Sequence, residues 1–156
     1  MVEHIPFTTV KEDYNDYLVE NGQILRVKYM LVDIVEKVVD GKIHGQLGHK
    51  ESSYVISPDN LDTSGMEVAD LKSVTDKDRV REVSFKPIKE VINIYETTTN
   101  IILLSNPVNV IYLTNKKTKE NNPILRYKAD LLTYLIDKSA LSKRENTPEE
   151  SNTHQT

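Results

Sequence analysis

Apolar and polar residues alternate along much of the chain, which is the pattern of a β-strand with one buried face. The alternation is clearest after residue 24, where Leu25 and Val27 are interleaved with Arg26 and Lys28. Further along the same run, aliphatic residues occupy both faces. Residues 24–39 therefore predict one long strand that is buried on both sides at one end.

Turn signals divide the first seventy residues into a meander. Asn21-Gly22 predicts a tight type I′ hairpin turn, because this dipeptide accepts positive φ angles. Asp40-Gly41 predicts a second turn after the long strand. We expect residues 44–50, HGQLGHK, to form a loop that leads into a third strand over residues 53–57, which Pro58 stops.

The second half repeats this order of elements after an acid-rich connector over residues 58–78, for which we expect one helical turn near residues 66–71. Asn106-Pro107 interrupts the strand-like runs, because proline lacks the N–H that a ladder needs. The predicted strands of this half cover residues 79–85, 91–97, 101–104 and 108–113.

The run after Pro123 fits two kinds of element. Residues 124–128 alternate like a strand, whereas Tyr127, Leu131 and Leu135 have helical spacing. We expect a strand through about residue 128, followed by a short C-terminal helix. The tail from residue 142 onward has almost nothing to bury, so we expect it to be disordered.

Two stretches of the sequence, seventy-eight residues apart, are nearly the same. Residues 7–17 read FTTVKEDYNDY, and residues 85–95 read FKPIKEVINIY. Continued without a gap, this alignment gives eight identities over the 29 positions from Phe7 to Val35. We interpret the likeness as an internal duplication.

A competing alignment shifts the chain by one hundred residues and matches residues 20–28 with residues 120–128. It requires a hairpin insertion of 22 residues, the difference between the two offsets, and one long strand over residues 124–136. The gapless alignment is preferred because it needs no insertion. Under either alignment, part of the likeness reflects shared strand propensity.

A single meander has one apolar face and cannot bury it alone, whereas two copies can close a core between them. We therefore predict an all-β fold: a small antiparallel barrel or sandwich of two internally duplicated β-meanders with about six to eight strands. Phe7 and Phe85 would be equivalent packing positions, as would Tyr17 and Tyr95. The predicted single domain covers residues 1–141, with a first repeat over about 5–61, a connector over 62–78, a second repeat over about 79–131 and a disordered tail over 142–156.

Composition argues against several classes of function. The 20 basic and 24 acidic side chains give a formal charge of -4, so no chain-wide positive field exists to hold nucleic acid. The absence of cysteine excludes disulfides, thiolate metal sites and a cysteine nucleophile. The N-terminal MVEHIPF does not resemble a signal peptide, and no stretch reaches the roughly 20 apolar residues of a membrane helix. We expect a cytoplasmic protein that has no membrane partner.

The sequence contains no arrangement typical of a catalytic or metal site. His44 and His49 are the closest pair of histidines, whereas a zinc site needs three or four converging ligands. The chain also lacks a nucleophile elbow, a phosphate-binding glycine loop and a dinucleotide fingerprint. We predict no catalytic residue, no metal and no cofactor, and hence a non-enzymatic protein.

Two kinds of binding function remain. By elimination, we predict a binding or protein-interaction module that contacts a protein partner or a second copy of itself. The alternative is a single-stranded nucleic-acid-binding barrel, because small barrels bind single strands with basic and aromatic side chains. Charged hairpin tips, however, also serve to prevent aggregation. The candidate residues lie around one predicted hairpin: Lys116, Lys117, Lys119, Arg126, Tyr127 and Lys128.

Overall fold

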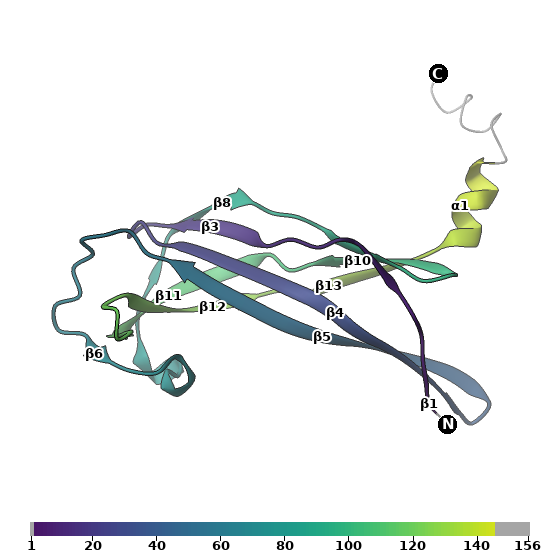
Figure 1. Ribbon diagram of the computed structural model, residues 1–156, viewed down its shortest axis with the longest axis horizontal. Coiled ribbons are helices and arrows are strands. Elements are labelled where there is room, and N and C mark those ends of the chain that lie inside the picture. The colour runs from purple at the N-terminus through teal and green to yellow at the C-terminus, as the bar shows by residue number, and fades with distance from the viewer. Residues whose placement is uncertain (1, 146–156) are drawn as a thin grey trace, which may run out of the picture.

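The computed structural model describes residues 2–145, and most of them are in antiparallel strands (Figure 1). The all-β prediction is confirmed. The strands are β1 (Val2–His4), β2 (Thr8–Lys11), β3 (Asn15–Val19), β4 (Ile24–Val39), β5 (Lys42–Ile56), β6 (Glu67–Val68), β7 (Arg79–Val83), β8 (Phe85–Lys89), β9 (Asn93–Glu96), β10 (Asn100–Ser105), β11 (Val108–Lys117), β12 (Pro123–Ala129) and β13 (Leu132–Asp137). Two short 3-10 turns (Leu71–Ser73 and Asp76–Asp78) and the helix α1 (Lys138–Glu145) complete the described chain.

These strands form three sheets. In the first sheet, β4 pairs with β5 on one side and with β1 and β3 on the other, and β8 continues the sheet beyond β3. The second sheet has the order β13-β10-β9-β2, and in the third β11 pairs with β12, β6 and β7. Over the described residues the sheets stay open, so the barrel that we considered does not close. In Figure 1 the long β4–β5 hairpin crosses β12 and β13.

The two halves of the chain exchange strands. Strand β2 of the first half pairs with β9 of the second, and β3 of the first half pairs with β8 of the second. The Tyr17 ring packs edge-on against Phe85 with the ring centroids 5.6 Å apart, and Tyr95 packs the same way against Phe7 at 5.9 Å. Each contact becomes the other when residue numbers shift by seventy-eight. The predicted equivalence of these aromatic positions is therefore confirmed.

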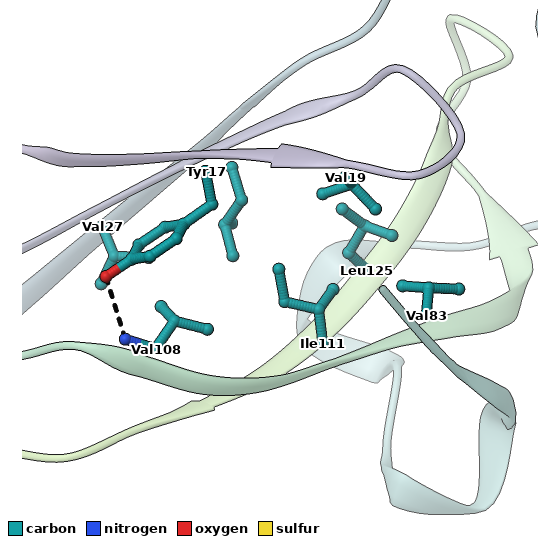
Figure 2. Packing of buried hydrophobic residues seen from close by; sticks show 8 residues of the cluster. Tyr17, Val19, Val27, Val83, Val108, Ile111 and Leu125 are labelled. Atoms are coloured by element: carbon teal, nitrogen blue, oxygen red, sulfur yellow. Dashed lines mark hydrogen bonds between the residues drawn. The ribbon is translucent and has the colours of Figure 1, made fainter. Parts of the chain in front are cut away.

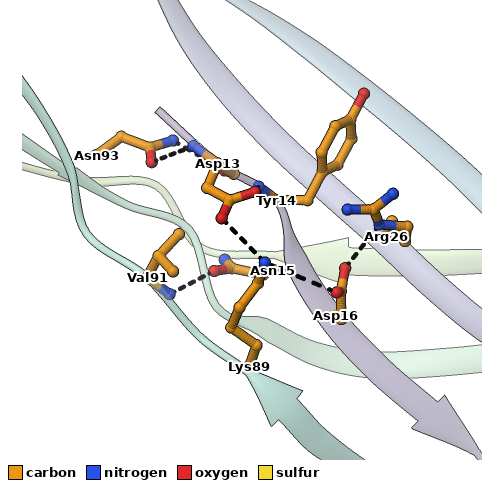
Figure 3. A network of polar contacts seen from close by, with 8 residues as sticks. All are labelled: Asp13, Tyr14, Asn15, Asp16, Arg26, Lys89, Val91 and Asn93. Carbon is orange, nitrogen blue, oxygen red and sulfur yellow. Dashed lines mark hydrogen bonds and ion pairs between the residues drawn. The ribbon is translucent and has the colours of Figure 1, made fainter. Parts of the chain in front are cut away.

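Polar contacts follow the same reciprocity. The Tyr17 hydroxyl donates to the Glu90 carboxylate at 2.7 Å, and the Tyr95 hydroxyl donates to that of Glu12. Asn15 accepts a hydrogen bond from the Val91 N–H at 2.7 Å, while Asn93 accepts one from the Asp13 N–H at 2.9 Å (Figure 3). Burial and then the carboxylate partner raise the pKa of both tyrosines. The exchanged strands are thus joined by buried polar groups as well as by apolar packing.

The core is divided into two clusters. One surrounds Tyr17, whose hydroxyl also accepts a hydrogen bond from the Val108 N–H at 3.0 Å (Figure 2). The other surrounds Tyr95 and lies toward the distal half of the β4–β5 hairpin. The buried members of the first cluster are Tyr17, Val19, Leu25, Val27, Val83, Val108, Ile111 and Leu125; those of the second are Leu31, Ile34, Tyr95, Ile102 and Leu104.

Strand β5 is longer than the sequence predicted. Residues 44–50 are not a loop, because all of them pair with β4, from Lys37 opposite His44 to Met30 opposite Lys50. The ladder skips Val32 on β4, and this bulge absorbs the change of register. Long-range pairing therefore outweighs the local preference of two glycines for turns. The described chain has thirteen strands rather than the predicted six to eight, in part because strands as short as the two-residue β6 are counted.

The first two turns differ from each other in geometry. At Asn21-Gly22 only the glycine has a positive φ, of 94°, and its N–H donates to the Val19 carbonyl. This is a three-residue hairpin loop with glycine in the left-handed position, not the type I′ turn that we predicted. Asp40 and Gly41 both have positive φ, as a type I′ turn requires.

The C-terminal prediction was wrong over residues 129–137. Strand β12 ends at Ala129, and β13 follows it and pairs with β10 from Leu132 opposite Ser105 to Asp137 opposite Asn100. The helix begins only at Lys138. The predicted short C-terminal helix is thus confirmed, with a later start; it extends to Glu145, and residues 146–156 lie outside the described chain.

Candidate interaction surface

One side of strand β5 is not paired with any described strand. This strand pairs with β4 along its length, and no described residue hydrogen-bonds to the backbone of its other side. About half of the N–H and C=O groups of this fifteen-residue strand therefore point away from β4, toward solvent. An edge of this kind is a template on which a further strand can pair.

Other sheet edges of the described chain are shorter or blocked. Strand β8 has Pro87 at its centre, which removes a donor, and β12 begins at Pro123. Strand β13 is six residues long. Strand β5 contains no proline, and the bulge in its ladder lies on β4, so two of the usual protections of an edge are missing, while the charged side chains of Lys42 and Lys50 remain.

A cavity of about 420 Å³ lies beside the first half of this edge. Residues 45–47 of β5 form one wall, and residues 97–100 of the β9–β10 turn lie opposite. Five aliphatic side chains line the apolar part: Ile5, Ile34, Leu47, Ile102 and Leu135. We call this space the distal cavity. It extends the second core cluster outward to solvent.

A second cavity, of about 250 Å³, lies beside the other end of β5. Residues 53–55 of β5 line it together with residues 123–125 of β12. Leu71 of the connector, which is 69% exposed, forms its outer rim. We call this space the proximal cavity. Residues of β5 thus line both cavities.

Glu51 joins β5 to β12 beside the proximal cavity. Its carboxylate accepts a hydrogen bond from the Tyr127 hydroxyl. A hydrogen bond to the same carboxylate, followed by burial, raises the pKa of Tyr29 to about 12. Burial and the same carboxylate also raise the pKa of Tyr127. The hydrogen bond from Tyr127 to Glu51 thus connects β12 to β5, and the proximal cavity lies next to it.

The charges on β5 are mainly positive. Lys42 and Lys50 are exposed and form no ion pair with any described residue, whereas Glu51 is held by tyrosines. His44 and His49 are five positions apart on one strand and therefore point to opposite faces. Burial lowers the pKa of His49. The described residues contain no group of three potential metal ligands.

The predicted basic hairpin lies at the other end of the molecule from α1, on β11 and β12. The structure brings its residues together but also pairs two of them with the acidic connector. The Lys116 ammonium is 2.8 Å from the Glu67 carboxylate, and the Arg126 guanidinium is 2.9 Å from that of Asp76. Tyr127 points to Glu51 across the layers, so its ring lies on the face opposite to that of Arg126. Lys117, Lys119 and Lys128 have no ion pair to any described residue.

Sequence reasoning did not identify β5 as an edge. Whether a strand is central or peripheral depends on where distant segments pair, and alternation alone does not encode this. The signal that was present is the run of fifteen residues without proline, from Lys42 to Ile56. Interpreting its glycines as a loop concealed that run.

Comparison with known proteins gave no match: no family model, curated protein or solved structure is similar to this chain. Among the described residues, no helix has the length and apolar character needed to cross a membrane. The candidate surface is therefore defined by its own geometry.

Proposed function

We propose that this protein is a non-enzymatic interaction module that binds an extended segment of a protein partner along the free edge of β5. The observation that carries the proposal is the fifteen-residue backbone edge, which has neither proline nor a covering strand among the described residues. Strand addition gains affinity from main-chain hydrogen bonds and specificity from pockets beside the edge. Residues of β5 line two cavities, one toward each end of the strand.

We further infer that the module arose by internal duplication and acts in the cytoplasm. The reciprocal contacts of Tyr17 and Tyr95 support the duplication, because unrelated segments have no reason to exchange both aromatic and carboxylate partners. The cysteine-free composition is compatible with a reducing compartment.

The nucleic-acid alternative has weaker support. Lys116 and Arg126 are each neutralised by a nearby carboxylate, and the Tyr127 hydroxyl is engaged by Glu51. A single strand needs free cations and exposed rings together. Replacing Lys116 and Lys117 with glutamate tests this alternative directly, since it should abolish salt-dependent oligonucleotide binding if such binding exists.

The proposal is tested with proline variants of the edge. Along a strand, successive N–H groups point alternately to the two sides, so of Gly45→Pro and Gln46→Pro one keeps the β4 ladder intact. The variant with the higher melting temperature is the one to use. We expect it to lose proteins that the wild type captures from nuclease-treated lysate, while the Lys116→Glu, Lys117→Glu variant keeps them. Equal capture by the proline variant, or loss of all partners on nuclease treatment, would overturn the proposal.

A further inference from the structure

We propose that the segment bound by β5 is acidic and carries two apolar side chains eight residues apart, one for each cavity. This inference rests on the proposed function and specifies the chemistry of the partner. It follows from the positions of the cavities, from what lies between them and from the charge of the edge.

The spacing comes from the register of β5. Leu47 lines the distal cavity and Val55 lines the proximal cavity, and both pack against core clusters on the inner face of the strand. They are eight residues apart, an even number, so their side chains lie on the same face. Eight residues of extended chain span roughly 27 Å. A strand paired with β5 therefore reaches both cavities with side chains of a single face.

The segment between the anchors must be small on that face. The Tyr127 hydroxyl donates a hydrogen bond to the Glu51 carboxylate beside the proximal cavity, which Tyr127 also lines. A large side chain opposite Glu51 would collide with this bridge. We expect serine, threonine, alanine or glycine at the inner positions between the two anchors.

The charge of the partner follows from the unpaired lysines. Lys42 and Lys50 have no described ion-pair partner, and Lys50 lies on the outer face between the cavities. The acidic residue of β5, Glu51, accepts a hydrogen bond from Tyr127. Glu36, which lines the distal cavity, is the one carboxylate there. Acidic residues at outer positions of the partner would face Lys50, whereas basic ones would be repelled.

The probe is a display library of fully randomised eleven-residue peptides, selected on the full-length protein. Enriched peptides should have an apolar residue at two positions eight apart and an excess of Asp and Glu. Two variants close the cavities from exposed positions: Leu135→Arg at the distal cavity and Leu71→Arg at the proximal cavity. Tyr134→Arg and Val80→Arg are the matched controls, because both residues are exposed and line neither cavity.

Each cavity variant should weaken binding of a selected peptide roughly ten- to a hundred-fold, the effect of losing one buried apolar side chain, and the controls should not. Moving one anchor of the peptide by a single residue should have the same effect, because it turns that side chain to the other face. Some selected peptides could bind the wild type but not the β5 proline variant and yet lack two apolar residues eight positions apart. Such peptides would overturn this inference and leave the proposed function standing. Recovery of no peptide that depends on the β5 edge would overturn both.

Discussion

Removing the hydroxyl group from either exchanged tyrosine should destabilise the protein by a similar amount. In Tyr17→Phe, the Glu90 carboxylate loses a donor at 2.7 Å and the Val108 N–H loses its acceptor at 3.0 Å. In Tyr95→Phe, Glu12 and the Leu31 N–H lose the corresponding partners. Both tyrosines and the two backbone N–H groups are buried, so water does not replace the acceptors of these N–H groups, whereas Glu90 is exposed and its carboxylate can be hydrated.

The size of the effect follows from the groups that are left without partners. A hydrogen bond to a charged group contributes about 1.5–3 kcal/mol, part of which hydration of the carboxylate returns, and an unsatisfied buried N–H costs about 1–3 kcal/mol. Since part of this is recovered when the structure relaxes, we expect each variant to lose about 2–4 kcal/mol of unfolding free energy. The Leu31 N–H lies 3.3 Å from the Tyr95 hydroxyl, so Tyr95→Phe should fall toward the lower value.

Urea unfolding followed by far-UV circular dichroism at pH 7 measures this loss. The control is Tyr54→Phe, because Tyr54 is 58% exposed and makes no hydrogen bond to a described residue, and its unfolding free energy should change by less than about 0.5 kcal/mol. A loss below that limit for both buried variants, or a loss confined to one of them, would refute the reasoning from reciprocal contacts.

Three further outcomes are expected, each measurable by urea unfolding. The pKa values of Tyr17 and Tyr95 are raised in the folded state, so their contribution to the unfolding free energy is fully present below pH 10 and is lost above it, by about 1.4 kcal/mol per pH unit for each tyrosine. A variant with phenylalanine at both positions should therefore lose stability less steeply above pH 10. An unchanged slope would contradict the raised pKa values. Gly22→Ala should cost about 1–2 kcal/mol, because its φ is +94° and a Cβ would lie 3.2 Å from the Pro58 ring, whereas Gly45→Ala should be nearly neutral; equal effects would argue against the loop geometry. Thr114→Val should lose about 1–3 kcal/mol, since the buried hydroxyl donates to the Ile124 carbonyl at 2.6 Å, and a neutral result would show that the hydroxyl is dispensable.

The sequence predicted those features of the fold that depend on local pattern. Alternation identified β4, and Pro107 correctly marked the break between β10 and β11. The likeness of residues 7–17 to residues 85–95 identified two aromatic positions with equivalent environments. Each of these features was predicted from the types of side chain within a short stretch of sequence.

Features that depend on distant partners were not predictable in this way. Leu131 and Leu135 have helical spacing, yet β13 forms because β10 offers an edge in register with it. The same limit applies to the candidate surface, since nothing within residues 42–56 indicates that only one side will find a partner. The ion pairs that neutralise Lys116 and Arg126 come from Glu67 and Asp76 of the connector, about fifty residues earlier in the chain.

The strand exchange also determines the order in which the protein can fold during synthesis. Strand β3 pairs with β8, and β2 with β9, so residues near the N-terminus wait for partners that are translated more than sixty residues later. Contacts of such long sequence separation slow folding, and they leave strand edges uncovered on the nascent chain. The β4–β5 hairpin, whose partners are adjacent in sequence, is complete much earlier. A ribosome-bound first half would therefore display β3, β4 and β5 already paired, with the outer edge of β3 uncovered and β2 unpaired, until the second half emerges.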